Sequence, residues 1–251
     1  MSGIFSWSPF SLLLLFFLLG GFFFAVGMVC LKHFAWQAGR DVLSIPVAAF
    51  IGTVATAWAL SLGFTAADAW SINSDAARAA SSERSSLSRL EGMARPEALN
   101  SEALIAALAH YRSAVGQIEW AENLNRFPTP EAEAALQELR MSILKLAKAD
   151  VATPIIGQIV QDFDELQDAR NTRIALGNSA VNQYKWYLVL SLTFITIVVT
   201  ASIHADRPRA GRKALMMFSA TAALSLWILA IHANPYAGVG QSSLDLLVVP
   251  Q

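Results

Sequence analysis

Four long runs of the chain carry no Asp, Glu, Lys or Arg, and they constrain its fold more than any other feature. The runs are Phe10–Leu31, Val42–Ala67, Trp186–Ile203 and Ala214–Ala233, of 22, 26, 18 and 20 residues. A helix rises about 1.5 Å per residue, so roughly 20 apolar residues cross the hydrocarbon core of a bilayer. Helices of a soluble protein show an apolar stripe, whereas these runs are apolar all round. The sequence therefore predicts a multi-pass membrane protein with four spans.

The composition excludes several other classes of protein. The hydrophobic share is 55% and the charged share 15%, against about 45–50% and about 25% in soluble domains. A net charge of -1 provides no basic surface for nucleic acid. The chain has no Gly-rich phosphate loop, no G-x-S-x-G and no H-E-x-x-H motif. We therefore expect no enzyme, no catalytic residue, no cofactor and no metal.

Ionisable side chains are also missing where a pump would need them. Transporters and proton pumps place such residues inside their spans, and none of the four span interiors has one. The acidic stretch "QDFDELQDARNTR" at 161–173 lacks the loop spacing of a Ca²⁺ site. We expect it to form a solvated helix face.

The short loops predict how the spans are oriented. The loop between the first two spans carries Lys32 and Arg40, and "DRPRAGRK" between the last two carries four more positive charges. Lys and Arg in short loops stay in the cytoplasm. Both termini and residues 68–183 are then non-cytoplasmic, in what we expect to be a bacterial inner membrane. Aromatic residues at these outer span ends are expected to be headgroup anchors: Trp7, Trp70, Tyr184, Trp186, Tyr187 and Tyr236.

Residues 68–183 have the pattern of amphipathic helices, because apolar residues recur every three or four positions. The first helix continues from the second span to about Met93. Ser101, Thr129 and Thr153 are suitable N-caps for three more helices, the last of which is expected to run into the third span. Their apolar stripes are Leu104, Leu108, Tyr111, Val115 and Ile118; Leu136, Leu139, Ile143 and Leu146; and Ile156, Ile159, Phe163 and Leu166.

Four such helices joined by short loops predict an antiparallel bundle. The expected fold class is all-α, with four transmembrane helices and an extramembrane four-helix stalk between spans two and three. The expected parts are a first transmembrane pair (1–67), the bundle (68–183), a second transmembrane pair (184–236) and a short C-terminal tail (237–251). Narrow stripes can be shared between subunits, so we expect a homo-oligomer in the lipid bilayer, with a stalk open to a protein partner.

The second span is rich in small residues, among them Gly52, Thr56 and Gly63. Small residues let helices approach closely, so one interpretation is simple helix packing. The other is that this helix lines a narrow pore with its constriction near Ile45, Phe50 and Thr53, because hydrophobic constrictions can gate by dewetting.

The chain turns sharply after the fourth span, at "NPYAG". Asn234-Pro235 cannot continue a helix, and Gly238 releases the chain. Tyr236 has the character of an interfacial anchor.

Several short motifs, in order along the chain, resemble the bacterial bestrophin-like membrane-protein family. They are "DV" at 41–42, "GTVATAWALSLGF" at 52–64, Tyr111, Glu119-Trp120, "ARNTRI" before the third span and the "NPYAG" turn. The resemblance covers nearly the whole chain. It implies kinship with bestrophins, which are pentameric anion channels whose second span lines the pore. It also implies that the middle segment is cytosolic, opposite to the orientation that the loop charges predict.

Two hypotheses for the function follow. The first is a non-enzymatic membrane protein whose helical stalk binds a partner or senses the envelope. The alternative is a homo-oligomeric anion channel with the second span lining the pore. A ring of identical second spans would favour the channel, whereas a monomer or two-fold dimer with a closed membrane bundle would favour the first hypothesis.

Thiol labelling of intact cells tests the orientation. With Cys30 replaced by alanine, a cysteine at Ala103 or Ala237 should react with a membrane-impermeant reagent, because both positions are predicted to lie outside. A cysteine at Ala210, in the cationic loop, should not react. Labelling at 210 alone would reverse the orientation.

Overall fold

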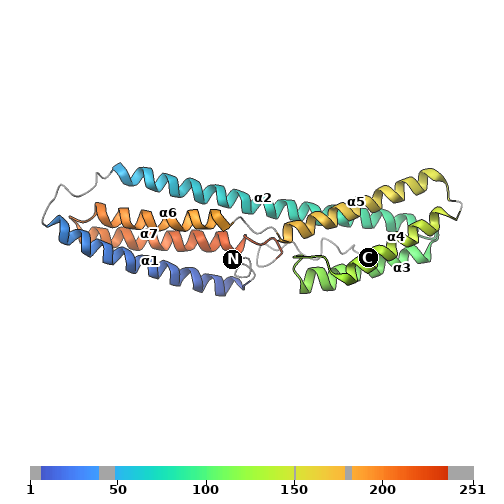
Figure 1. The fold of residues 1–251 in the computed structure, drawn as a ribbon, viewed down its shortest axis with the longest axis horizontal. Coiled ribbons are helices and arrows are strands. Elements are labelled where there is room, and N and C mark those ends of the chain that lie inside the picture. Colours follow the sequence, from blue (N-terminus) through green and yellow to red (C-terminus); the bar gives the residue numbers. More distant parts are fainter. Residues whose placement is uncertain (1–6, 40–48, 150, 179–182, 237–251) are drawn as a thin grey trace. The chain divides into compact units, whose positions relative to one another are not determined.

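The computed structural model describes residues 7–39, 49–149, 151–178 and 183–236, and every regular element in these ranges is a helix. The all-α prediction is thus confirmed. The helices are α1 (Pro9–Ala38), α2 (Ala49–Ala94), α3 (Glu102–Ala114), η3 (Val115–Glu122), α4 (Pro130–Ala147), α5 (Thr153–Asn178), α6 (Gln183–Ile203) and α7 (Pro208–Ile231), as labelled in Figure 1 except for η3.

The chain divides into two compact units, which are described separately. We call residues 1–70 with 181–234 the membrane unit, and residues 71–180 with 235–251 the bundle unit. Four helical stretches are long and apolar enough to cross a membrane, and their apolar parts are α1, the first part of α2, α6 and α7. These are the four predicted spans.

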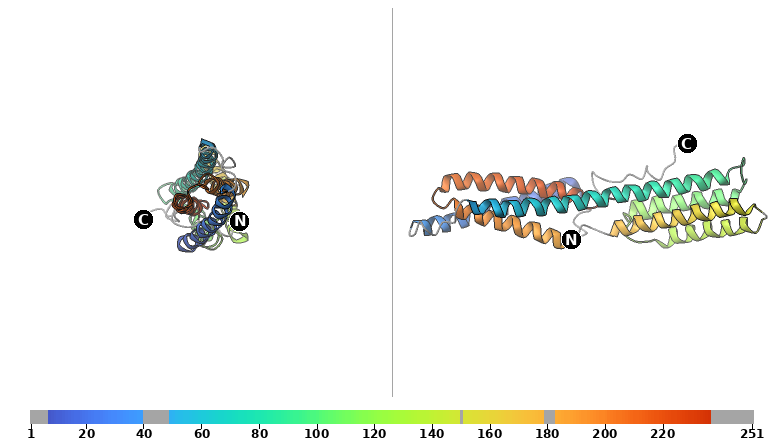
Figure 2. Two further views of the ribbon diagram at one scale, coloured as in Figure 1. Left: turned by 90° about the vertical axis from the view of Figure 1, so that its left-hand side faces the viewer. Right: turned by 90° about the horizontal axis from the view of Figure 1, so that it is seen from above.

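Within the membrane unit, α1, α6 and α7 lie side by side (Figures 1 and 2). Two glycines let α1 come close to its neighbours: a Cβ on Gly20 would lie 2.8 Å from the Cβ of Ala223, and one on Gly27 would lie 2.9 Å from Leu215. Such small residues are the usual means of close packing between helices in lipid. Trp186 is buried and stacks on Phe16 at 6.4 Å between ring centroids. Its predicted role as a surface anchor is therefore wrong.

Within the bundle unit, the second part of α2 shares one apolar core with α3, η3, α4 and α5. Two of the three predicted caps are present: Ser101 Oγ accepts from the amide of Leu104 at 3.3 Å, and Thr129 Oγ1 from that of Ala132 at 3.4 Å. Thr153, the third, is itself the first residue of α5. The predicted stripes supply a large part of the core, with these members fully buried: Leu104, Leu108, Tyr111, Leu139, Ile159 and Leu166. α2 ends at Ala94, one residue beyond the predicted end.

One stripe departs from prediction where the helix changes type. Residues Val115–Glu122 are π-helical, and the wider turn rotates the side chains that follow. Ile118 is consequently half-exposed, whereas Glu119 and Trp120 are buried. The prediction that Ile118 belongs to the buried stripe is wrong for this reason.

α5 ends at Asn178, and residues 179–182 lie outside the described residues. The prediction that this helix runs into the third span therefore stays a prediction. Gly177 lets α5 approach the backbone of Asn125 closely, because a Cβ at this position would overlap the carbonyl oxygen of Asn125. Asn125 itself has a φ of 55°, a left-handed conformation that asparagine tolerates better than most residues.

Two aspartate substitutions test the bundle and its π-helical shift. Leu108→Asp places a charge at a site that is 0% exposed, so we expect a loss of about 3–5 kcal/mol in unfolding free energy. Ile118→Asp, at the half-exposed position, should cost less than about 1 kcal/mol. Thermal unfolding in detergent, followed by helical circular dichroism, measures both. Equal losses would contradict the shifted register.

Candidate functional site

The bundle unit contains a buried network of charged side chains. Glu83, Glu119, Arg170 and Arg173 are each no more than 1% exposed. Arg173 donates to both carboxylate oxygens of Glu83, from Nε at 2.6 Å and Nη2 at 3.0 Å. Arg170 donates likewise to Glu119, from Nη2 at 2.5 Å and Nε at 3.2 Å. Arg173 Nη2 also reaches Glu119 at 3.2 Å, which joins the two pairs into one network.

The network takes its members from every helix of the bundle. Glu83 lies on α2, Glu119 on η3, and the two arginines lie one turn apart on α5. Tyr111 of α3 donates its hydroxyl to Glu83 at 2.8 Å. On α4, Glu133 accepts from Arg170 at 2.8 Å, and the amide of the N-cap residue Thr129 donates to Glu119 at 3.2 Å. Asn125, in the loop before α4, accepts from Arg173.

Electrostatics favour the charged state of the two arginines in this network. Burial alone would lower the pKa of Arg173, but the carboxylate of Glu83, with smaller effects from Tyr111 and Glu119, outweighs it and raises that pKa. Burial, assisted by the negative charge of Glu83, raises the pKa of Tyr111 well above its usual value. The arginines therefore stay charged and the tyrosine stays a hydrogen-bond donor. The two buried glutamates face the two buried arginines, so the network holds the helices of the bundle together.

The C-terminal turn enters the same core. Tyr236 is 0% exposed, and its ring packs edge-on against Trp120 with 5.3 Å between centroids. The guanidinium of Arg173 lies over the ring of Trp120, 5.3 Å from its centroid, in a cation–π contact. Tyr236 is therefore part of the bundle core, and its prediction as an interfacial anchor is wrong. Asn234 and Pro235 precede it as predicted, while Gly238 lies outside the described residues.

The acidic stretch of α5 is not entirely the solvated face that was predicted. Asp162 is 1% exposed and accepts from Arg89 Nε at 2.7 Å and from Gln158 Nε2 at 3.1 Å. Arg89 also pairs with Glu165. This stretch thus fixes α5 against α2.

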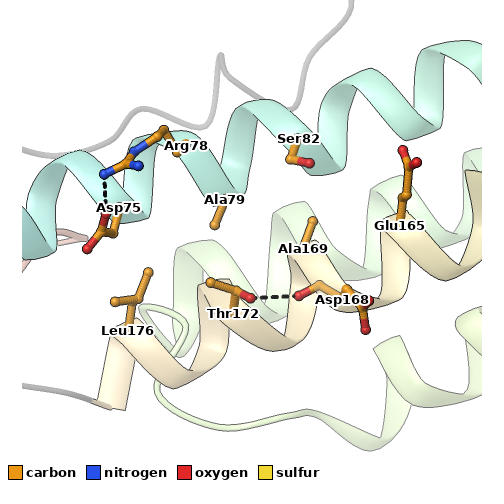
Figure 3. A pocket seen from close by; sticks show the side chains of 9 residues that line it. All are labelled: Asp75, Arg78, Ala79, Ser82, Glu165, Asp168, Ala169, Thr172 and Leu176. Atoms are coloured by element: carbon orange, nitrogen blue, oxygen red, sulfur yellow. Dashed lines mark hydrogen bonds and ion pairs between the residues drawn. The ribbon is translucent and has the colours of Figure 1, made fainter.

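An open groove of about 520 Å³ separates other residues of α2 and α5 (Figure 3). Asp75 and Arg78 pair with each other on α2, and Glu165 and Ala169 point toward α2 from α5 (Figure 3). Among the described residues, no group of three or more His, Cys, Asp or Glu side chains is placed to hold a metal ion. The groove therefore gives no reason to assign a cation.

Two of the three residues predicted to line a pore lie at the start of α2. Phe50 is 51% exposed and Thr53, one turn later, is also exposed. Ile45 lies outside the described residues. Trp58 is the buried contact of this part of α2: its indole N–H donates to Thr193 of α6 at 2.8 Å, and its ring meets Phe218 of α7 edge-on at 5.2 Å.

Removing one charge from the buried network should be costly. Arg173→Met leaves Glu83 without its main partner, so we expect a loss of about 3–5 kcal/mol in unfolding free energy. The control is Arg140→Met, which removes an exposed arginine of α4 and should cost less than about 1 kcal/mol. Thermal unfolding of both variants in detergent gives the comparison, and a similar small loss in each would contradict a structural role for the network.

Comparisons with known proteins identify the family of this chain and solved structures with a similar fold. The sequence profile of the Bestrophin-like domain matches residues 16–243. No protein of curated function matches the chain. A crystallised mutant membrane protein has a TM-score of 0.70 at 15% identity, covering 90% of this chain and 93% of that one. Two point mutants of a bacterial bestrophin homologue from Klebsiella pneumoniae have TM-scores of 0.69 and 0.67, each at 14% identity over 91% of this chain, covering 96% and 94% of theirs. At such identities the likeness is one of fold, whereas the profile match spans most of the sequence: the chain belongs to the Bestrophin-like family of integral membrane proteins.

Proposed function

We propose that this protein forms a homo-oligomeric channel for small anions, with α2 lining the pore. The observation that carries the proposal is how little of α2 is buried in the membrane unit. In the most apolar 18-residue stretch of each helix, 6% of the residues are buried in α2, against 28% in α1 and 39% in α7. Between Ala49 and Trp70 the buried residues are Trp58, Thr65 and Ala69. One side of α2 is thus held by α6 and α7, and the rest is available to other copies or to a water path.

The exposed surface of α2 carries large apolar side chains at Leu60, Phe64 and Trp70, but part of it has residues that favour contact with protein or water over lipid. Gly52, Thr53, Thr56 and Gly63 are all exposed, and a Cβ on either glycine would meet nothing within 4 Å. Lipid-facing helix surfaces are covered by large apolar side chains, whereas glycine and threonine are typical of contacts between helices. Identical α2 helices packed around an axis would use such a surface.

We propose that Phe50 and Thr53 form the constriction of the pore, together with Ile45, as the sequence predicts. An aromatic ring beside a hydroxyl makes a narrow section that is only partly wetted, which is one way that channels gate. The spans carry no ionisable side chain in their interiors, so the proposed transport is passive. Anions are proposed as the permeant class because of the family's kinship with bestrophins.

The orientation and division of the chain are proposed with the channel. Residues 68–183 form the extramembrane bundle, on the non-cytoplasmic side if the loop charges decide the orientation. The other hypothesis, a stalk that binds a partner, gains no specific support from the bundle surface. It becomes the better account if the protein proves not to conduct.

Oligomeric state and flux test the proposal together. Native mass measurement in detergent should give a ring of at least three copies, because a pore lined by one helix per copy needs several. Chloride efflux from liposomes then measures conduction. A folded monomer or two-fold dimer with tight liposomes would refute the channel.

Truncating the proposed constriction separates a pore residue from a packing residue. Phe50→Ala should raise chloride efflux several-fold, because a wider and wetter section lowers the barrier. The matched control is Phe22→Ala on α1, where the phenylalanine is similarly exposed at 59%. Efflux is measured on samples of equal thermal stability. Equal efflux in both variants would remove Phe50 from the pore lining.

A further inference from the structure

The groove between α2 and α5 carries an excess of negative charge (Figure 3). Three of its lining residues are acidic, namely Asp75, Glu165 and Asp168, and one is basic, Arg78. Arg78 pairs with Asp75, and Glu165 pairs with Arg89. The side chain of Asp168 is exposed and makes no ion pair with any residue that the structure describes. The groove therefore has one carboxylate left to bind a positive charge.

A matching positive charge lies on the other flank of α2. Arg84 is half-buried, and its side chain forms no hydrogen bond or ion pair within the described ranges. Successive residues of a helix are turned by about 100°. Arg84 thus lies about 100° to one side of the buried Glu83, while Ser82 of the groove lies about 100° to the other side. Two turns beyond Arg84, Glu91 pairs with Arg112, so this flank is the one next to α3.

The surface of α2 between these two flanks is made of small side chains. Ser81, Ser85 and Ser88 are exposed, and their positions on the helix point away from Glu83. Serine has a lower helix propensity than alanine, so the needs of the helix alone do not explain it here. The distance between two packed helices depends on the side chains at their contact. This surface therefore allows α2 helices of neighbouring copies to lie close together.

The unpaired arginine and the unpaired aspartate lie at nearly the same height along the bundle. α2 and α5 run in opposite directions and are joined by two ion pairs, Glu83 with Arg173 and Arg89 with Asp162. Arg84 falls between these pairs on α2, and Asp168 falls between them on α5. Rotation about an axis parallel to the helices leaves the height of every residue unchanged. Arg84 of one copy can therefore meet Asp168 of the next.

We infer that Arg84 of one copy binds Asp168 in the groove of a second copy, and that this ion pair joins the bundle units head to tail. The inference rests on the homo-oligomer in the proposed function, and it does not depend on conduction. The two charges lie on different flanks, so the contact uses different surfaces of the two copies, which is how cyclic rings larger than a dimer are built. Complementary charges across an interface fix the partner and the register.

Charge reversal tests the pair. Arg84→Glu places a second carboxylate against Asp168, and like charges across an interface are strongly unfavourable. The concentration at which the oligomer half-dissociates in detergent should therefore rise by about tenfold or more. Asp168→Arg should have the same effect, because it brings two arginines together. The double variant Arg84→Glu, Asp168→Arg exchanges the two charges and should recover most of the wild-type affinity. Mass measurement over a dilution series gives these concentrations.

A matched control reverses a charge elsewhere on the bundle. Lys145 is exposed on α4, which carries neither member of the pair. Lys145→Glu should leave the half-dissociation concentration unchanged. The melting temperature of each variant shows whether its copies are folded.

Cross-linking measures the contact without relying on affinity. In a chain with Cys30→Ala, the pair Arg84→Cys and Asp168→Cys should give linked products larger than a dimer when a short bifunctional thiol reagent is added. Each copy is then joined to two neighbours. Either cysteine alone should give no product beyond a dimer.

The outcomes separate this inference from the proposed channel. An assembled wild type that is unaffected by both reversals, with no linked product beyond a dimer, would overturn the inference and leave the channel standing. A folded double variant that stays as weak as the single variants would overturn it as well. An assembled wild type that responds as expected but does not conduct would remove the channel and keep the inference. A folded monomeric wild type would remove both.

Discussion

The buried network of two glutamates and two arginines is the interaction on which the extramembrane structure depends. Glu83, Glu119, Arg170 and Arg173 come from three separate elements, and each has its charge matched within the core. Breaking a buried pair costs far more than the pair contributes over an apolar equivalent. Such a network therefore fixes which helices meet, and in which register, more than it adds to stability. The apolar stripes alone would tolerate a slip of one turn, whereas the charges would not.

The membrane unit is organised by a different constraint, which is the unequal packing of its helices. α1 is locked to α7 through Gly20 and Gly27, while α2 is held mainly by Trp58. A helix with little burial of its own surface must find its neighbours elsewhere. The same helix enters the bundle, where Glu83 joins it to the charged network. α2 therefore contributes to the core of the bundle unit, whereas little of its surface is buried in the membrane unit.

Most of the helices were predictable from the sequence, because capping residues and apolar periodicity act locally. Ser101 and Thr129 mark helix starts by hydrogen bonds that span three residues. What could not be predicted depends on partners distant in the chain. The π-helical turn buries Glu119 in place of Ile118, and no local sequence pattern predicts such a turn. A pair of arginines in "ARNTR" was visible, but only the fold shows that both are buried against distant glutamates. Of the predicted pore residues, Phe50 and Thr53 are placed on an exposed turn, and their function depends on an assembly that one chain does not contain.

The burial of Tyr236 has a consequence for the order in which the protein is made. This residue follows α7 in the chain, yet its ring completes a core built from residues 71–180. Those residues leave the ribosome well before the last two membrane helices. Their core therefore lacks one aromatic ring until both helices have been synthesised. Completion of the bundle core is coupled in this way to synthesis of the last two membrane helices, and a product truncated after α7 would lack this ring in its core.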